Sequence, residues 1–77
     1  MPTKLFGASW MRQTKQSLIA LEDANVSFEF VDINDQPYMA GVLTTVLGEY
    51  QLPVLFVDGR PYKGGSRINE YLREATK

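Results

Sequence analysis

The segment PVLFVDGRPY, residues 53–62, predicts a β-hairpin. Two apolar runs flank Asp58 and Gly59, a dipeptide that fits the type I′ turn, in which both central residues have a positive φ. Pro61 has no N–H to donate to a neighbouring strand, so the second run must be an edge strand. The chain therefore contains a β-sheet that has this hairpin at one side.

The N-terminal part of the chain predicts two strands joined by a helix. Residues 3–8, TKLFGA, are typical of a short buried strand, and residues 27–32 alternate polar and apolar side chains. Between them, residues 10–24 repeat apolar side chains at helical spacing. We expect Ser9 to cap this helix and Asn25 to end it in a left-handed conformation. Because a helix connects the two strands, they should be parallel, with a right-handed crossover.

A second helix is predicted between the first two strands and the hairpin. Asn34 or Asp35 should cap it, Pro37 fits its first turn, and Gly48 should end it after Leu47. The apolar side chains expected on its buried face are Met39, Val42, Leu43, Val46 and Leu47.

The chain closes with a helix that follows a glycine loop. Ser66 is the expected cap, and Ile68, Tyr71 and Leu72 provide the apolar face. The element order is then βαβαββα in a single domain, residues 1–77. This order predicts an α/β fold, with a four-stranded mixed sheet covered by helices on both faces.

Composition excludes several classes of function. The chain has 77 residues, no cysteine and no histidine, so we expect neither a disulfide nor a metal site. Its net charge is −1 and it has no basic stripe, which argues against nucleic-acid binding. No apolar run is long enough for a membrane span, and the first residues do not form a signal peptide. The expected location is therefore the cytoplasm.

Two segments together resemble the glutaredoxin form of the thioredoxin fold. KLFGASWMRQTKQSLIALEDANVSFEFVDI is similar to the family's first βαβ unit, and QLPVLFVDGRPYKGG to its second half. By this resemblance the Leu52–Pro53 bond would be cis. QLPVLFVDGRPY followed by SRINEYL also resembles the N-terminal domain of glutathione transferases. Both resemblances imply the same fold and glutathione as the ancestral ligand.

The resemblance places Met11 and Thr14 where glutaredoxins have their two cysteines. A thioether cannot form a mixed disulfide, and a threonine hydroxyl has no histidine to activate it. Cluster binding also needs a thiolate from the protein. Thiol–disulfide exchange is therefore excluded, no catalytic residue is expected, and the simpler role of Met11 is packing.

Part of a glutathione site is predicted from the resemblance. Leu52 would present its main chain beside Pro53, and the amides of Gly64, Gly65 and Ser66 would receive a carboxylate. The family's basic partners for the other carboxylate are missing, because Ala8 and Glu49 occupy those regions. We therefore expect weak glutathione binding or none. In a transferase-like alternative, Ser9 would donate a hydrogen bond to the glutathione thiolate.

The main functional hypothesis is a binding module without redox activity. Trp10, Met11 and Arg12 would line a groove beside Leu52 and Pro53, and Tyr62 is a further candidate for its wall. Tryptophan, methionine and arginine are enriched at protein interfaces. The expected partner is thus a protein or peptide, and enzymatic activity is not expected.

Overall fold

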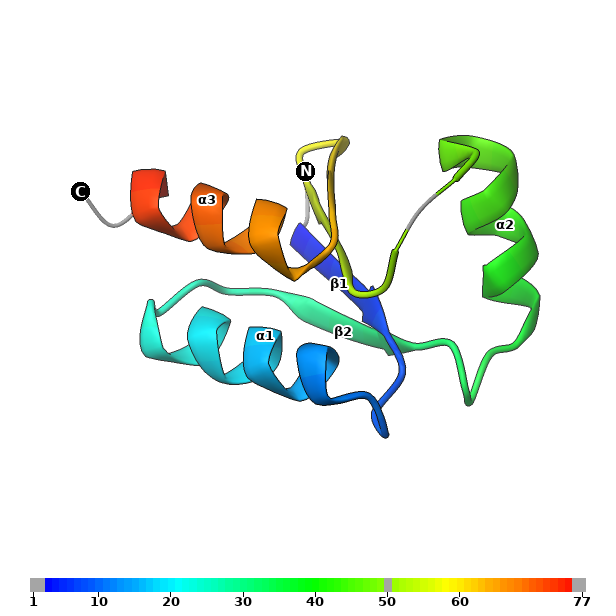
Figure 1. Cartoon of the computed structure of the whole chain (residues 1–77), viewed down its shortest axis with the longest axis horizontal. Coiled ribbons are helices and arrows are strands. Elements are labelled where there is room, and N and C mark those ends of the chain that lie inside the picture. Colours follow the sequence, from blue (N-terminus) through cyan, green and yellow to red (C-terminus); the bar gives the residue numbers. More distant parts are fainter. Residues whose placement is uncertain (1–2, 50, 76–77) are drawn as a thin grey trace.

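The computed structural model describes residues 3–49 and 51–75. Its four strands form one sheet in the order β2-β1-β3-β4, with β1 and β2 parallel and the other pairs antiparallel (Figure 1). The predicted α/β fold and mixed sheet are confirmed. In chain order the elements are β1 (Thr3–Gly7), α1 (Arg12–Asp23), β2 (Glu29–Asp32), α2 (Tyr38–Leu47), β3 (Val54–Val57), β4 (Arg60–Lys63) and α3 (Gly65–Ala75).

The main core lies between the sheet and the helices α1 and α3, which run side by side (Figure 1). Tyr62 of β4 and Tyr71 of α3 close one end of this core, with ring centroids 5.0 Å apart. The sequence left Tyr62 as a candidate for the groove wall, but its ring packs on this core instead. The buried residues of the core are Leu5, Leu21, Leu55, Ile68 and Leu72.

The other face of the sheet is covered only in part, by α2. Phe6 and Phe56 make an edge-to-face contact there, with centroids 5.4 Å apart. Of the five side chains predicted to be buried on α2, only Leu43 is buried. Val42 is 43% exposed and Val46 is 64% exposed, so the predicted buried face is wrong for these two. These two side chains are exposed because α2 lies towards one end of the sheet rather than across it (Figure 1).

The hairpin forms as predicted. Asp58 and Gly59 have φ values of 52° and 84°, as a type I′ turn requires. Strand β4 lies at the edge of the sheet, where the missing N–H of Pro61 breaks no central ladder.

The predicted end of α1 is also correct. Asn25 has φ 57°, its N–H donates to the Glu22 carbonyl at 3.0 Å, and the Val26 N–H donates to the Leu21 carbonyl at 3.0 Å. These two bonds form a Schellman motif, in which the left-handed residue lets the chain turn back on the helix.

The three predicted helix caps are wrong. Met11, not Ser9, precedes α1, because a turn that joins the Met11 N–H to the Ala8 carbonyl at 2.9 Å delays the helix. Pro37 precedes α2 in place of Asn34 or Asp35. Ser66 lies inside the first turn of α3, which begins at Gly65.

Candidate functional site

The sheet register brings the predicted site residues to one end of the sheet. Gly7 pairs with Asp32 of β2, while Phe6 pairs with Val54 of β3. The chain segments that leave β1 and enter β3 therefore lie side by side. The loop of residues 8–11 is thus placed beside Leu52 and Pro53.

A cis peptide bond joins Leu52 to Pro53. Pro53 is buried, and its carbonyl accepts the Gly64 N–H at 2.9 Å. This bond continues the pairing of β3 with β4 and holds the start of α3 against the proline. Leu52 is half-buried beside it.

Thr14 has a structural role that sequence reasoning missed. Its side chain is fully buried, and its Oγ1 accepts the Ala8 N–H at 3.3 Å. Gly7 makes this approach possible, since a Cβ at that position would lie 2.6 Å from Thr14 Oγ1. The hydroxyl therefore fixes the loop before α1. A small residue at the end of a strand, seven positions before a threonine, was the available signal.

Met11 occupies the position just before α1. Its side chain is half-buried and makes no capping hydrogen bond to the helix. The amides of the first helical turn have no partner inside the helix, and they lie next to this residue. A thiolate at this position would be stabilised by those amides, but a thioether carries no charge for them to stabilise.

Ser9 and Asp32 form a polar pair that the sequence did not predict. The hydrogen bond from the Ser9 hydroxyl, followed by one from the Asn34 N–H, lowers the pKa of the Asp32 carboxyl. The Asn34 N–H reaches Asp32 Oδ1 at 2.9 Å, which makes an Asx-turn. The spacing of Asp32 and Asn34 was a readable signal for the turn, but not for the contact with Ser9.

The start of α3 supplies fewer free amides than predicted. The Gly64 N–H is already bound to the Pro53 carbonyl, and the Gly64 carbonyl accepts the Ile68 N–H at 3.2 Å. The amides of Gly65 and Ser66 lie in the first helical turn, where a helix leaves its N–H groups without an intrahelical partner. Gly64 therefore stabilises the turn, and the amides of Gly65 and Ser66 remain for an anion to bind.

A cation lies near the region where the sequence predicted none. Lys63 Nζ of β4 donates to the Glu49 main-chain carbonyl at 3.4 Å. Together with Gly48 and Gln51, these residues line an open polar hollow of about 560 Å³ beside the segment that leads to Leu52. Sequence reasoning missed Lys63 because the contact joins residues that are far apart in the chain.

Trp10 is the most exposed large side chain of this end of the sheet. It is 69% exposed, and Arg12 is also exposed. Trp10 precedes Met11 in the loop that the register places beside Leu52, and Arg12 follows it as the first residue of α1. We call the exposed region formed by Trp10, Met11, Arg12, Leu52 and Pro53 the cis-proline surface.

The part of the chain that the structure describes contains no group of three or more acidic, histidine or cysteine side chains that could hold a metal ion. Within the same residues, no helix is long and apolar enough to cross a membrane.

Comparison with known proteins assigns the family. The sequence profile of the glutaredoxin family, described as Glutaredoxin, matches residues 5–62. The chain belongs to the glutaredoxin family. No curated protein sequence matches it.

Solved structures show the same fold at low sequence identity. A buckwheat glutaredoxin–glutathione complex aligns with TM-score 0.83 and 14% identity, covering 97% of this chain and 71% of that one. The glutaredoxin-like protein NrdH-redoxin from Escherichia coli aligns with TM-score 0.75 and 24% identity, covering 91% and 93%. A diazinon-metabolizing glutathione S-transferase from the silkworm Bombyx mori aligns with TM-score 0.81 and 21% identity. This chain is covered to 96% but spans only 38% of that transferase.

The family and the composition together limit the chemistry. Glutaredoxin chemistry passes through a thiolate and a mixed disulfide. This member of the family has no cysteine, so it cannot carry out that exchange. The fold is retained without the reacting sulfur.

Proposed function

We propose that this glutaredoxin-family chain binds an extended segment of a protein partner at the cis-proline surface and has no redox activity. The observation that carries the proposal is the 69% exposure of Trp10 at the end of the sheet where Leu52 and Pro53 lie. Leu52 would pair with the bound segment through its main chain, while Trp10 and Met11 would cover the side chains of that segment.

Energetics favour a contact through Trp10. A tryptophan buries a large apolar area at low cost in side-chain entropy, and its ring N–H can still find a partner at a rim. Tryptophan and arginine are also the residue types most often found at binding hot spots. Trp10 and Arg12 flank the half-buried Met11, which gives this surface an apolar centre with a cation beside it.

Selection from a displayed peptide library on the folded chain tests the proposal. The selected peptide should shift the backbone amides of Leu52 and Met11 in an NMR titration. Trp10→Ala should weaken its binding about thirtyfold, as expected for loss of a hot-spot side chain. Tyr38→Ala is the matched control, because Tyr38 is 68% exposed but lies at the start of α2. Equal affinity of the Trp10 variant and the wild type would refute the proposal.

Glutathione is a second candidate ligand, supported by the buckwheat glutaredoxin that was crystallised with it. The amides of Gly65 and Ser66 would receive one carboxylate, and Lys63 beside Gln51 would supply a cation for the other. We propose binding without transferase activity, because the Asp32 carboxylate competes with an incoming thiol for the Ser9 hydroxyl.

A glutathione titration separates the two candidates. Saturable shifts of the Leu52 and Ser66 amides below millimolar concentration would support a glutathione site. Lys63→Met should then weaken that binding severalfold, while Arg73→Met, at the far end of α3, should not. If glutathione causes no chemical-shift change at these amides while the selected peptide binds as expected, the peptide is the ligand.

A further inference from the structure

A second, separate cavity lies between α2 and the face of the sheet opposite the main core. Its volume is about 310 Å³. Phe6 and Phe56 form its floor with their edge-to-face contact, and Met39, Val42 and Val46 of α2 form its wall. This volume lies at the small end of the range for ligand pockets in proteins, about 300–1,000 Å³.

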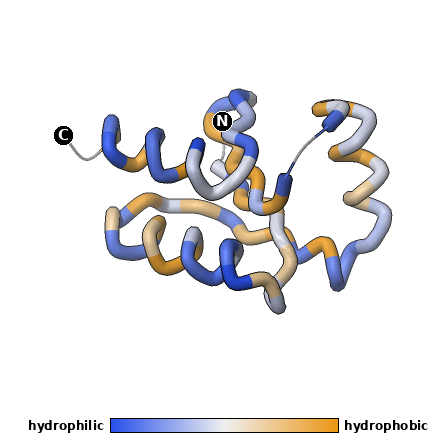
Figure 2. Tube along the Cα trace, viewed as in Figure 1, coloured by the Kyte–Doolittle hydropathy of each residue, from blue (hydrophilic) through white to orange (hydrophobic). Residues whose placement is uncertain are grey.

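The cavity leaves apolar side chains in contact with water. Val42 is 43% exposed and Val46 is 64% exposed, and α2 has no charged residue from Tyr38 to Leu47. Figure 2 shows α2 pale to orange over most of its length, whereas α1 and α3 carry hydrophilic segments. Covering these side chains would remove apolar surface from water, which is favourable.

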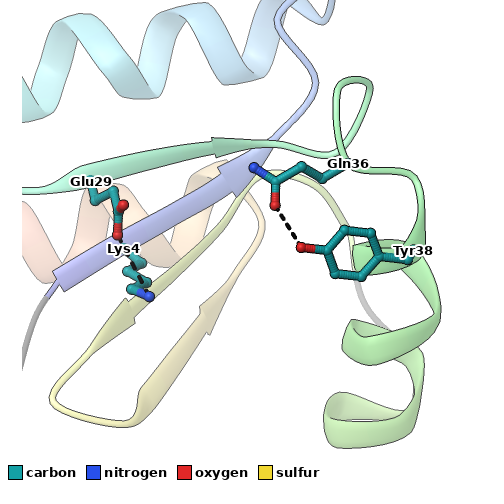
Figure 3. Close-up of polar contacts among 4 residues, drawn as sticks. All are labelled: Lys4, Glu29, Gln36 and Tyr38. Atoms are coloured by element: carbon teal, nitrogen blue, oxygen red, sulfur yellow. Dashed lines mark hydrogen bonds and ion pairs between the residues drawn. The ribbon is translucent and has the colours of Figure 1, made fainter.

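The charge at the cavity is confined to one side. Among the described residues that line it, Lys4 is the only charged one. Its Nζ lies 3.5 Å from Glu29 Oε2, across the parallel pair of β1 and β2 (Figure 3). Both side chains are well exposed, so this ion pair is weak and can exchange partners.

We propose that this cavity binds a medium-chain fatty acid or a similar small amphiphile with one carboxylate. The aliphatic chain would lie on Phe6 and Phe56 under Val42 and Val46, and the carboxylate would replace Glu29 at Lys4. A whole helix is about 10 Å wide and does not suit a cavity of 310 Å³. A water molecule has a share of about 30 Å³ in the liquid, and a methylene group is of similar size, so about eight to ten carbons fit.

Octanoate and 1-octanol are the probes, because they share a chain length and differ in charge. In NMR titrations below the concentration at which either probe aggregates, octanoate should give saturable shifts at Phe6, Phe56 and Val46. It should bind about threefold more tightly than 1-octanol, as expected for one exposed charge contact. Hexanoate, two methylenes shorter, should bind about tenfold more weakly than octanoate.

Two pairs of variants test the assignment. Lys4→Met should remove the preference for the carboxylate, whereas Glu29→Gln should increase it about threefold by freeing Lys4. Val46→Asp should abolish octanoate binding, while Ile19→Asp, equally exposed at 59% but on α1, should leave it unchanged. Circular dichroism would verify that each variant folds.

The proposal fails if octanoate gives no saturable shift at the cavity residues. It also fails if the Val46 and Ile19 variants bind octanoate equally well. Equal affinities for octanoate and 1-octanol, unchanged by Lys4→Met, would overturn the role of the carboxylate. The cis-proline surface is not used in these titrations, so their outcome is independent of the peptide experiment.

Discussion

At the scale of single residues, the site is shaped by two short side chains that sequence reasoning assigned differently. Ser9 was expected to cap α1 but donates to Asp32 instead. Thr14, which the resemblance places at a cysteine position, accepts the Ala8 N–H. Both contacts hold the loop that presents Trp10. The Ser9 contact was not readable from local patterns, because it depends on a turn that delays the helix. For the Thr14 contact the local signal was Gly7, seven positions earlier.

The Asp32 carboxyl should titrate below the ordinary aspartate value of 3.8. The hydrogen bond from Ser9 is the main cause, so Ser9→Ala should raise the pKa of Asp32 towards 3.8. A depressed pKa in the folded state stabilises the fold above the unfolded pKa, and this contribution is lost as the pH falls through the folded value. Carbon-detected NMR of the carboxyl measures the pKa directly. An unchanged pKa in the Ser9 variant would contradict the assigned cause.

Thr14→Val should destabilise the chain by about 1 kcal/mol or more, because it leaves the buried Ala8 N–H without its acceptor. Thr44→Val is the control, since the Thr44 hydroxyl donates to the Ala40 carbonyl on an exposed helix face. That change should alter the free energy of unfolding by less than about 0.5 kcal/mol. Urea unfolding measures both, and equal losses would show that the Thr14 bond contributes nothing.

At the scale of elements, α1 begins directly after Met11, whose side chain carries no thiol. Met11→Cys should therefore produce a thiol with a pKa below the ordinary value of about 8.5, because the helix amides stabilise the thiolate. Ile19→Cys, exposed in the middle of α1, should keep an ordinary pKa. The pH dependence of iodoacetamide alkylation measures both values. Identical pKa values would mean that the start of α1 no longer favours an anion.

Replacing glycine by alanine should have opposite effects on stability in the hairpin and in α2. Gly59 has φ 84°, so Gly59→Ala should cost about 1–2 kcal/mol of stability. Gly41 lies within α2 with open space around its missing Cβ, so Gly41→Ala should stabilise the chain by about 0.5–1 kcal/mol. Thermal unfolding of the two variants should therefore move in opposite directions. A stabilising Gly59→Ala would contradict the type I′ turn.

At the scale of the whole molecule, the sequence predicted the order of the elements, the mixed sheet and the position of the hairpin. These features follow from hydrophobic periodicity and from the Asp58–Gly59 turn, which are local. The position of α2 towards one end of the sheet was not predictable, because a row of apolar side chains on a helix does not indicate which surface will cover it. The Lys63 contact with Glu49 escaped prediction for the same reason, since it depends on how β4 lies beside the end of α2.

The main core and the face of the sheet beside α2 should differ in the free energy of local opening. Leu43 is the only fully buried side chain of α2, whereas α1, α3 and the sheet share a core of five buried residues. Regions with little buried apolar contact open at lower free energy than the global unfolding reaction. In native-state hydrogen exchange, the amides of α2 should therefore exchange through a smaller opening than those of β1 and β3. Leu43→Ala should lower α2 protection further and leave β3 protection nearly unchanged, whereas Leu55→Ala should lower both. Equal protection across α2 and β3 in the wild type would mean that α2 and the core unfold as a single cooperative unit.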